Sequence, residues 1–134
     1  MTLKYLLDTN ICIYIAKEKP ATVLERFSNL EVGQVAMSTI TYGELIYGIE
    51  KSKLKKETLE KLEALAHLIP PLPLATDTGE YYGKIRSSLQ KKGKIIGNND
   101  LWIAAHALSL NTILVTNNEK EFKRVDKLKL ENWS

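Results

Sequence analysis

The chain has 134 residues, of which 44% are hydrophobic, and its formal net charge at pH 7 is +3. This size and composition are typical of one globular domain, so we expect a single domain over residues 1–134. The longest apolar run is far too short for a membrane span, the first residues lead directly into a strand-like run rather than a secretory signal, and a lone cysteine, Cys12, excludes a disulfide framework. We therefore expect a cytoplasmic protein with no membrane contact. A charge of +3 is too small to argue for a nucleic-acid partner by itself.

The first half of the chain alternates apolar runs with amphipathic segments. Residues 3–7 form a short apolar run that stops at Asp8, which is typical of a buried strand followed by a helix start. The expected inner face of a charged helix over 53–68 is Leu54, Leu59, Leu62, Leu65 and Ala66. The other predicted elements here are helices over 11–16, 21–30 and 42–50 and a strand over 35–38.

The second half contains the most apolar helix of the chain. Residues 69–74 hold three prolines and predict an edge strand or an extended connector. Asp77 is expected to cap a helix that runs to about Lys91 and ends before Gly93. The helix expected over 97–108 is apolar on nearly every side, which is typical of a buried helix, and its one acid lies in the first turn. Strands over 112–116 and 128–130 flank a helical turn over 119–122.

Strands that alternate with helices favour a three-layer α/β/α fold with a central, mainly parallel sheet. Four acids follow strands or open helices in this pattern: Asp8, Glu44, Asp100 and Glu121. Each also has an ordinary structural explanation. Asp8 can cap a helix, Asp100 favours the positive end of a helix dipole, and two acids stand in capping-box spacing. These two pairs are Thr41 with Glu44, and Asn118 with Glu121.

The topology gives a reason to take the four acids together. The carboxyl ends of parallel strands lie at one edge of the sheet, so Asp8, Glu44, Asp100 and Glu121 converge if their strands are neighbours. Clustered carboxylates repel one another unless a cation is present, and Mg²⁺ is the ion that prefers oxygen ligands with retained waters. The sequence contains no His/Cys cluster, no G-x-S-x-G motif and no glycine-rich phosphate loop. It therefore predicts metal-assisted phosphoryl chemistry.

Four motifs carry a family resemblance. They are Leu-Leu-Asp-Thr-Asn at 6–10, Ser-x-x-Thr-x-x-Glu-Leu-x-x-Gly at 38–48, Ile-Gly-Asn-Asn-Asp-x-x-Ile-Ala-Ala-His-Ala at 96–107, and Val-Thr-Asn-Asn-x-x-Glu-Phe at 115–122. In this order and spacing they resemble a PIN-domain ribonuclease, and more narrowly a VapC toxin of a bacterial type II toxin–antitoxin system. The resemblance covers essentially the whole chain. It implies an endoribonuclease dependent on Mg²⁺ or Mn²⁺ that inhibits translation by cutting a structured RNA, with initiator tRNA as the suggested substrate.

The resemblance also assigns roles by position. Asp8 and Asp100 resemble the metal ligands, and Glu44 resembles the third acid that positions the metal or its water. Thr116 and Asn118 resemble the polar pair near the metal or phosphate. Many PIN domains have aspartate where this chain has Asn118, which favours one bound ion before substrate arrives. Glu121 is a further candidate for the catalytic set, either as a substitute acid or as a residue at the edge of the site.

The same resemblance implies partners. A VapB-type antitoxin would cover the acidic crevice with its tail and would carry the pair to operator DNA. Family members are commonly homodimers, and the helices within 11–30 and 40–65 are candidates for that surface.

Two functional alternatives stay open. One is a catalytically silent PIN-like module that binds RNA or a partner, and the other is a DNA nuclease with the same metal chemistry.

Four further residues are candidates for substrate contact or for packing. Arg86 is the basic side chain that we expect near RNA phosphate. His106 is expected to be a structural histidine, and Trp102 and Trp133 are expected to pack rather than to stack on RNA bases.

Overall fold

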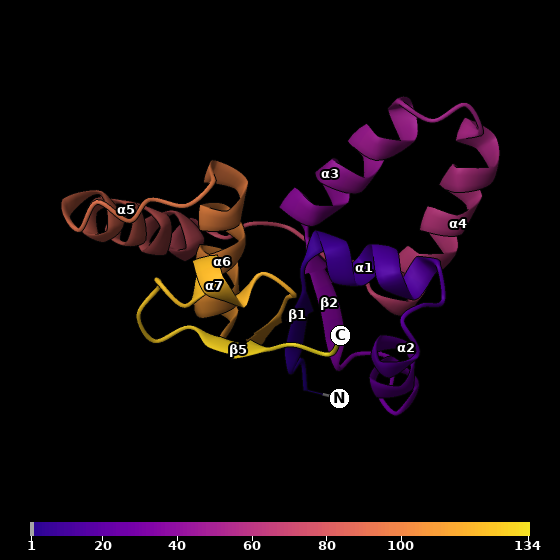
Figure 1. The fold of residues 1–134 in the computed structure, drawn as a ribbon, viewed down its shortest axis with the longest axis horizontal. Helices are drawn as coiled ribbons and strands as arrows, with labels where there is room; N and C mark the ends of the chain where they lie inside the picture. The colour runs from indigo at the N-terminus through magenta and orange to yellow at the C-terminus, as the bar shows by residue number, and fades with distance from the viewer. Residues whose placement is uncertain (1) are drawn as a thin grey trace.

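A parallel sheet organises the fold of residues 2–134, the part of the chain that this computed structural model describes. All its strand pairs are parallel, and the order is β3-β2-β1-β4-β5. In the central strand, Leu6 pairs with Ala36 on one side and with Leu114 on the other. Helices cover both faces of this sheet (Figure 1), so the predicted three-layer fold is confirmed. The strands are β1 Tyr5–Leu7, β2 Val35–Ser38, β3 Pro71–Leu72, β4 Ile113–Val115 and β5 Lys129–Glu131.

Two apolar clusters form the core, one on each face of the sheet. Successive side chains of a strand point to opposite faces. Tyr5 and Leu7 therefore pack into one cluster, and Leu6 packs into the other. All three residues of β1 are buried, which is typical of a central parallel strand covered on both sides.

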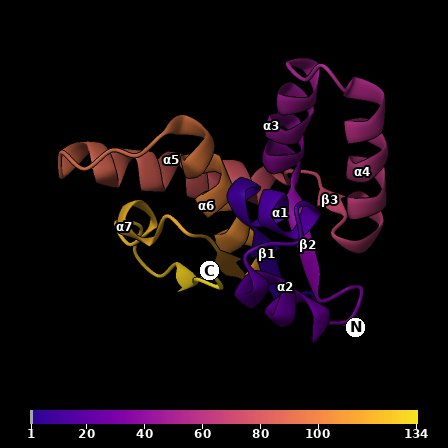
Figure 2. The same ribbon diagram turned by 45° about the vertical axis from the view of Figure 1, so that its right-hand side comes forward.

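The helices divide between the two faces according to these clusters. On the first face lie α1 Thr9–Ala16, α2 Ala21–Ser28, α3 Thr39–Glu50 and α4 Lys55–Leu68. On the second lie α5 Thr76–Lys91, α6 Asn98–Leu110 and α7 Glu119–Phe122. Figure 2 shows α3 and α4 as a hairpin that projects beyond the sheet. Within residues 2–134, none of the helices has the length and apolar character needed to cross a membrane.

The helix α6 is the buried helix that the sequence predicts. Leu101 and the run 103–107 are buried, and α5 packs against α6. The helix begins after Gly97 and ends at Asn111, whose φ of 54° lies in the left-handed region that often ends helices. The polar first turn of α6 therefore meets the sheet edge, while the rest of the helix fills the core.

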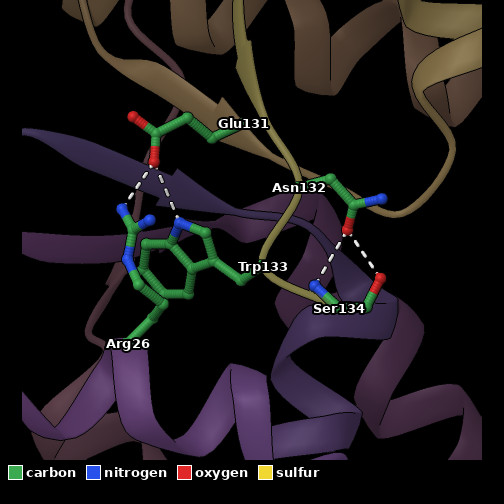
Figure 3. A network of polar contacts seen from close by, with 5 residues as sticks. All are labelled: Arg26, Glu131, Asn132, Trp133 and Ser134. Carbon is green, nitrogen blue, oxygen red and sulfur yellow. Dashed lines mark hydrogen bonds and ion pairs between the residues drawn. The ribbon is translucent and has the colours of Figure 1, made fainter.

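Trp133 packs the C-terminal segment against the sheet (Figure 3). The ring is buried and meets Tyr5 edge-on, with 5.2 Å between ring centroids. Its Nε1 donates to Glu131 Oε1 at 3.0 Å, and Arg26 Nη2 lies 2.8 Å from the same oxygen. The predicted packing role of Trp133 is confirmed.

The start of α3 differs from the prediction. This helix begins at Thr39, and the Ser38 hydroxyl caps it by accepting a hydrogen bond from Ile40 N–H. Thr41 and Glu44 thus lie inside the helix, and the predicted capping box at these two residues is wrong. Ser38 is a better cap because it ends β2 with extended backbone, which places its hydroxyl within reach of the Ile40 N–H.

Two further local predictions are wrong. Leu54 and Leu59 of the expected inner face of α4 are 60% and 39% exposed, whereas Leu62 and Leu65 are buried. Leu54 precedes the helix, so it does not share the buried face. Asp77 lies in the first turn of α5 rather than at the cap, which is Ala75.

Candidate active site at the carboxyl edge of the sheet

A polar pocket of about 160 Å³ lies at the carboxyl edge of the sheet, beyond β1 and β4. The chain adds β2 and β3 on one side of β1 and returns on the other side with β4 and β5, so this edge is a topological switch point. Ligands of open parallel sheets bind at such points. Asp8, Glu44 and Asp100 all line this pocket, so the expected convergence of these three acids is confirmed. The pocket is lined by Asp8, Thr9, Asn10, Glu44, Asp100, Ile103, Asn118 and Phe122.

Asp8 both caps a helix and lines the pocket. Its Oδ1 accepts a hydrogen bond from Ile11 N–H at 3.1 Å, which confirms the capping role, and the side chain is 6% exposed. Burial raises the pKa of Asp8, and the charge of Glu44 raises it further, while the Thr116 hydroxyl and the Ile11 amide oppose the rise. Capping and a place in the site are thus compatible in this residue.

Glu44 enters the pocket from α3 and is tied to α1. Its Oε1 accepts a hydrogen bond from the Thr9 hydroxyl at 2.6 Å, and Thr41 Oγ1 lies 3.5 Å from the same hydroxyl. Sequence reasoning did not single out Thr9. The sequence feature that could have identified Thr9 is its position directly after Asp8, in the first turn of a helix.

The pKa of Asp100 is raised by the other acids that lie near it. Burial raises the pKa of Asp100 to about 6, together with the charges of Glu121, Glu44 and Asp8 and a hydrogen bond with Glu121. The first residue before its helix is Gly97, which has no side chain to cap with. A carboxylate perturbed by several like charges in a cleft is a frequent mark of a functional site.

Asn118 links Glu121 to the pocket. Its Nδ2 donates to Glu121 Oε2 at 3.1 Å, and its backbone N–H donates to Thr116 Oγ1 at 2.9 Å. The predicted capping box, in which Glu121 would bind that backbone N–H, is therefore wrong. Glu121 lies beside Asp100 and Asn118 at the edge of the site, and the buried Thr116 lies against Asp8.

The donor chemistry of the pocket fits a hard divalent cation. No group of three or more His, Cys, Asp or Glu side chains within residues 2–134 is close enough to hold an ion by itself. Mg²⁺ does not need such a cage, because one or two carboxylates, waters and a substrate phosphate complete its shell. In the same part of the chain, no Lys or Arg side chain lines the pocket. The repulsion among its carboxylates is thus uncompensated, and a cation would relieve it.

The structure places Arg86 outside this pocket. Its Nη1 donates to the hydroxyl of Tyr82 at 2.8 Å, and that hydroxyl donates to the side chain of Asn98. The ring of Tyr82 stacks on Trp102 with 3.9 Å between centroids, which confirms the packing role of Trp102. Contact of Arg86 with phosphate stays a prediction.

His106 is a buried histidine of the core. It is 1% exposed, and its Nδ1 lies 2.8 Å from Ser38 Oγ, at the cap of α3. Burial lowers the pKa of His106, which favours the neutral ring. The expectation of a structural histidine is confirmed by this burial, but within residues 2–134 its Nε2 has no hydrogen-bond partner, so the ring is not fully satisfied.

The family is decided by comparison with known proteins. A model described as PIN domain matches residues 5–128. The chain belongs to the PIN domain family. It is 44% identical over 133 residues to "Ribonuclease VapC2" of Rickettsia felis, covering 96% of this chain and 97% of that protein. It is 45% identical over 132 residues to "tRNA(fMet)-specific endonuclease VapC" of Shigella flexneri, covering 98% and 99%.

Solved structures agree with the sequence comparison. The crystal structure of DNA-bound VapBC from Salmonella typhimurium contains a chain that superposes with a TM-score of 0.93 at 40% identity. The match covers 99% of this PIN domain and 100% of that chain. The resemblance to VapC proteins in four short motifs therefore extends through the whole PIN domain.

Proposed function

We propose that this PIN domain is a Mg²⁺-dependent endoribonuclease and the toxin of a type II toxin–antitoxin pair. The observation that carries the proposal is the gathering of Asp8, Glu44 and Asp100 around one pocket that no basic side chain lines in the described residues 2–134. The names of the relatives, ribonuclease VapC and tRNA(fMet)-specific endonuclease, support a structured RNA, and initiator tRNA in particular, as the substrate.

Each residue has a defined task in the proposed hydrolysis. Asp8 and Asp100 would hold the ion, and a bound Mg²⁺ or Mn²⁺ would lower the pKa of water and offset the charge that develops on the phosphate. Glu44 orients the attacking water and accepts its proton on Oε2, because Oε1 is engaged by Thr9. The oxygen of that water bonds to phosphorus as one P–O ester bond breaks, and the departing sugar oxygen takes up a proton from solvent water.

The remaining polar residues shape the rim of the pocket. Asn118 directs the carboxylate of Glu121 toward Asp100 through its amide hydrogen bond. Thr116 lies against Asp8 and helps to fix its orientation. Arg86 contacts a phosphate at a distance from the scissile bond. Asn118 and Glu121 thus complete the catalytic set. The buried Thr116, which the family resemblance placed near the metal or phosphate, supports that set through Asp8, and Arg86 serves substrate binding.

The proposal includes a VapB-type antitoxin. A second cavity, of about 540 Å³, runs between α1, α3 and α4 and shares Glu44 with the acidic pocket. A peptide in this largely apolar cavity would reach the acids, where a basic residue of the antitoxin could pair with them. We also propose that operator DNA is contacted through the antitoxin; the description of VapBC from Salmonella typhimurium as DNA-bound supports DNA binding by such a complex. We further propose a homodimer that acts in the cytoplasm.

The decisive experiment incubates purified protein with total RNA and with DNA, in Mg²⁺ and in excess EDTA. We expect RNA to be cut only with Mg²⁺, and the Asp8→Asn and Asp100→Asn variants to be inactive yet folded by circular dichroism. Exposed Glu60 on α4 supplies the matched control, Glu60→Gln, which should stay active.

Three other results would contradict the proposal. Full activity in EDTA would exclude the metal mechanism. Cleavage of DNA with RNA left intact would favour the DNA nuclease. Binding of RNA with the same affinity with and without Mg²⁺, and with no product, would favour the silent module.

A further inference from the structure

Thr9 lies between the first acid of the site and the second. It is the first residue of α1, directly after Asp8, and it is partly buried. Its hydroxyl donates to Glu44 Oε1 at 2.6 Å, across a sequence separation of 35 residues. Both side chains line the acidic pocket. Thr9 therefore lines the site from α1 and donates a hydrogen bond to a carboxylate that enters the site from α3.

The geometry of this bond is that of a strong hydrogen bond. A hydroxyl that donates to a carboxylate is typically about 2.5–2.7 Å from it and is roughly twice as strong as a neutral pair. The Thr9 hydroxyl has one proton, which the short contact assigns to Glu44. The buried Thr41 hydroxyl, 3.5 Å away, can only approach Thr9 as a weaker neighbour.

Glu44 needs such a restraint. Its side chain has three rotatable bonds and is partly exposed, and the carboxylates of Asp8 and Asp100 share its pocket. Repulsion from these charges favours rotamers that point Glu44 to solvent. We infer that the hydroxyl of Thr9 is a positioning group that holds the Glu44 carboxylate inside the acidic pocket. The catalytic consequence rests on the proposed function.

A matched set of variants tests the inference. Thr9→Val keeps the branched shape and removes the hydroxyl, whereas Thr9→Ser keeps the hydroxyl. In RNA cleavage with Mg²⁺, Thr9→Val should lower kcat about 10- to 100-fold with KM changed less than about threefold, because the loss of a charged hydrogen bond at one acid affects the chemical step. Thr9→Ser should stay within about threefold of the wild type. Thr76→Val, at an exposed threonine of α5, controls for the substitution itself.

A double-mutant cycle gives a readout that does not depend on activity. The unfolding equilibrium constants of the wild type, Thr9→Val, Glu44→Ala and the double variant are measured in EDTA at pH 8. The two changes should be coupled by at least about fivefold if the residues interact as described. A purely structural link between α1 and α3 would also give coupling, but it would not give a kcat loss that serine rescues.

The outcomes separate the inference from the proposed function. Additive stability effects, Thr9→Val activity within twofold of the wild type, or equal losses in Thr9→Val and Thr9→Ser would each overturn the role of Thr9. A wild type that cuts no nucleic acid would overturn the proposed function, and the stability cycle would then decide the inference alone.

Discussion

Asp100 should destabilise the metal-free protein at neutral pH. The pKa of this carboxyl rises from 3.8 to about 6 on folding, so the folded state holds its proton more tightly than the unfolded state. Stability must then fall as the pH rises from about 4 to about 6, and the loss is complete above that window. Replacing Asp100 with Asn removes the charge with little change in shape, and it should make the protein more stable at pH 8.

The magnitude follows from the same shift. A rise of this size corresponds to about 3 kcal/mol. Asp100 is only partly buried, so screening by water reduces the figure to about 1–2 kcal/mol. A carboxylate in the first turn of α6 also gains about 0.3–1 kcal/mol from the helix dipole, which the asparagine loses. The expected net gain of Asp100→Asn is therefore about 1 kcal/mol at pH 8 and close to zero at pH 4.

Urea unfolding in EDTA, followed by circular dichroism at pH 4 and at pH 8, measures this difference. Glu60→Gln serves as the control for loss of a negative charge at an exposed site of α4. The reasoning would be refuted if Asp100→Asn were less stable than the wild type at pH 8, or if the difference were the same at both pH values. Addition of Mg²⁺ should stabilise the wild type more than the variant, because binding to the folded state alone adds to its stability.

The structure predicts the outcomes of three further substitutions. Trp133→Ala should cost about 3–5 kcal/mol in urea unfolding and Trp133→Phe distinctly less, because the phenyl ring keeps the edge contact with Tyr5; equal losses would contradict this. Gly93→Ala should cost about 1 kcal/mol through the φ of 66° alone, since no atom lies within 4 Å of the added methyl, and an unchanged unfolding midpoint would show that the backbone relaxes. Asn118→Asp replaces the amide donor to Glu121 with a fifth acid; it should lower stability in EDTA at pH 8 by about 1 kcal/mol and increase the thermal shift caused by Mg²⁺ or Mn²⁺. A smaller shift than in the wild type would argue against metal binding at this position.

Much of the fold was predictable because its elements carry strong local signals. The alternation of short apolar runs with amphipathic helices determines the layers, and the apolar run after Asp100 marks the buried α6. Helix starts were less predictable. Ser38 and Thr41 are both acceptable caps by residue type, and only the extended backbone at the end of β2 selects Ser38.

The site was predictable as a set of acids but not as a network. Strand-end positions and the four family motifs identify Asp8, Glu44 and Asp100, and the parallel topology brings them to one edge. Hydrogen bonds between side chains of distant elements leave no periodic pattern in the sequence. The hydroxyl of Thr9 on Glu44 and the amide of Asn118 on Glu121 therefore emerge only when distant elements are packed together.

The strand order has a consequence for biosynthesis. A growing chain that has reached α5 already contains β1, β2, β3, Asp8 and Glu44, but the place beside β1 that β4 later fills is still open. Asp100 and Asn118 follow only with the last third of the chain. Domains form from the N-terminus at about 5–20 residues per second during translation. A nascent chain therefore cannot assemble the acidic pocket early, and any nuclease activity is confined to chains that are nearly complete.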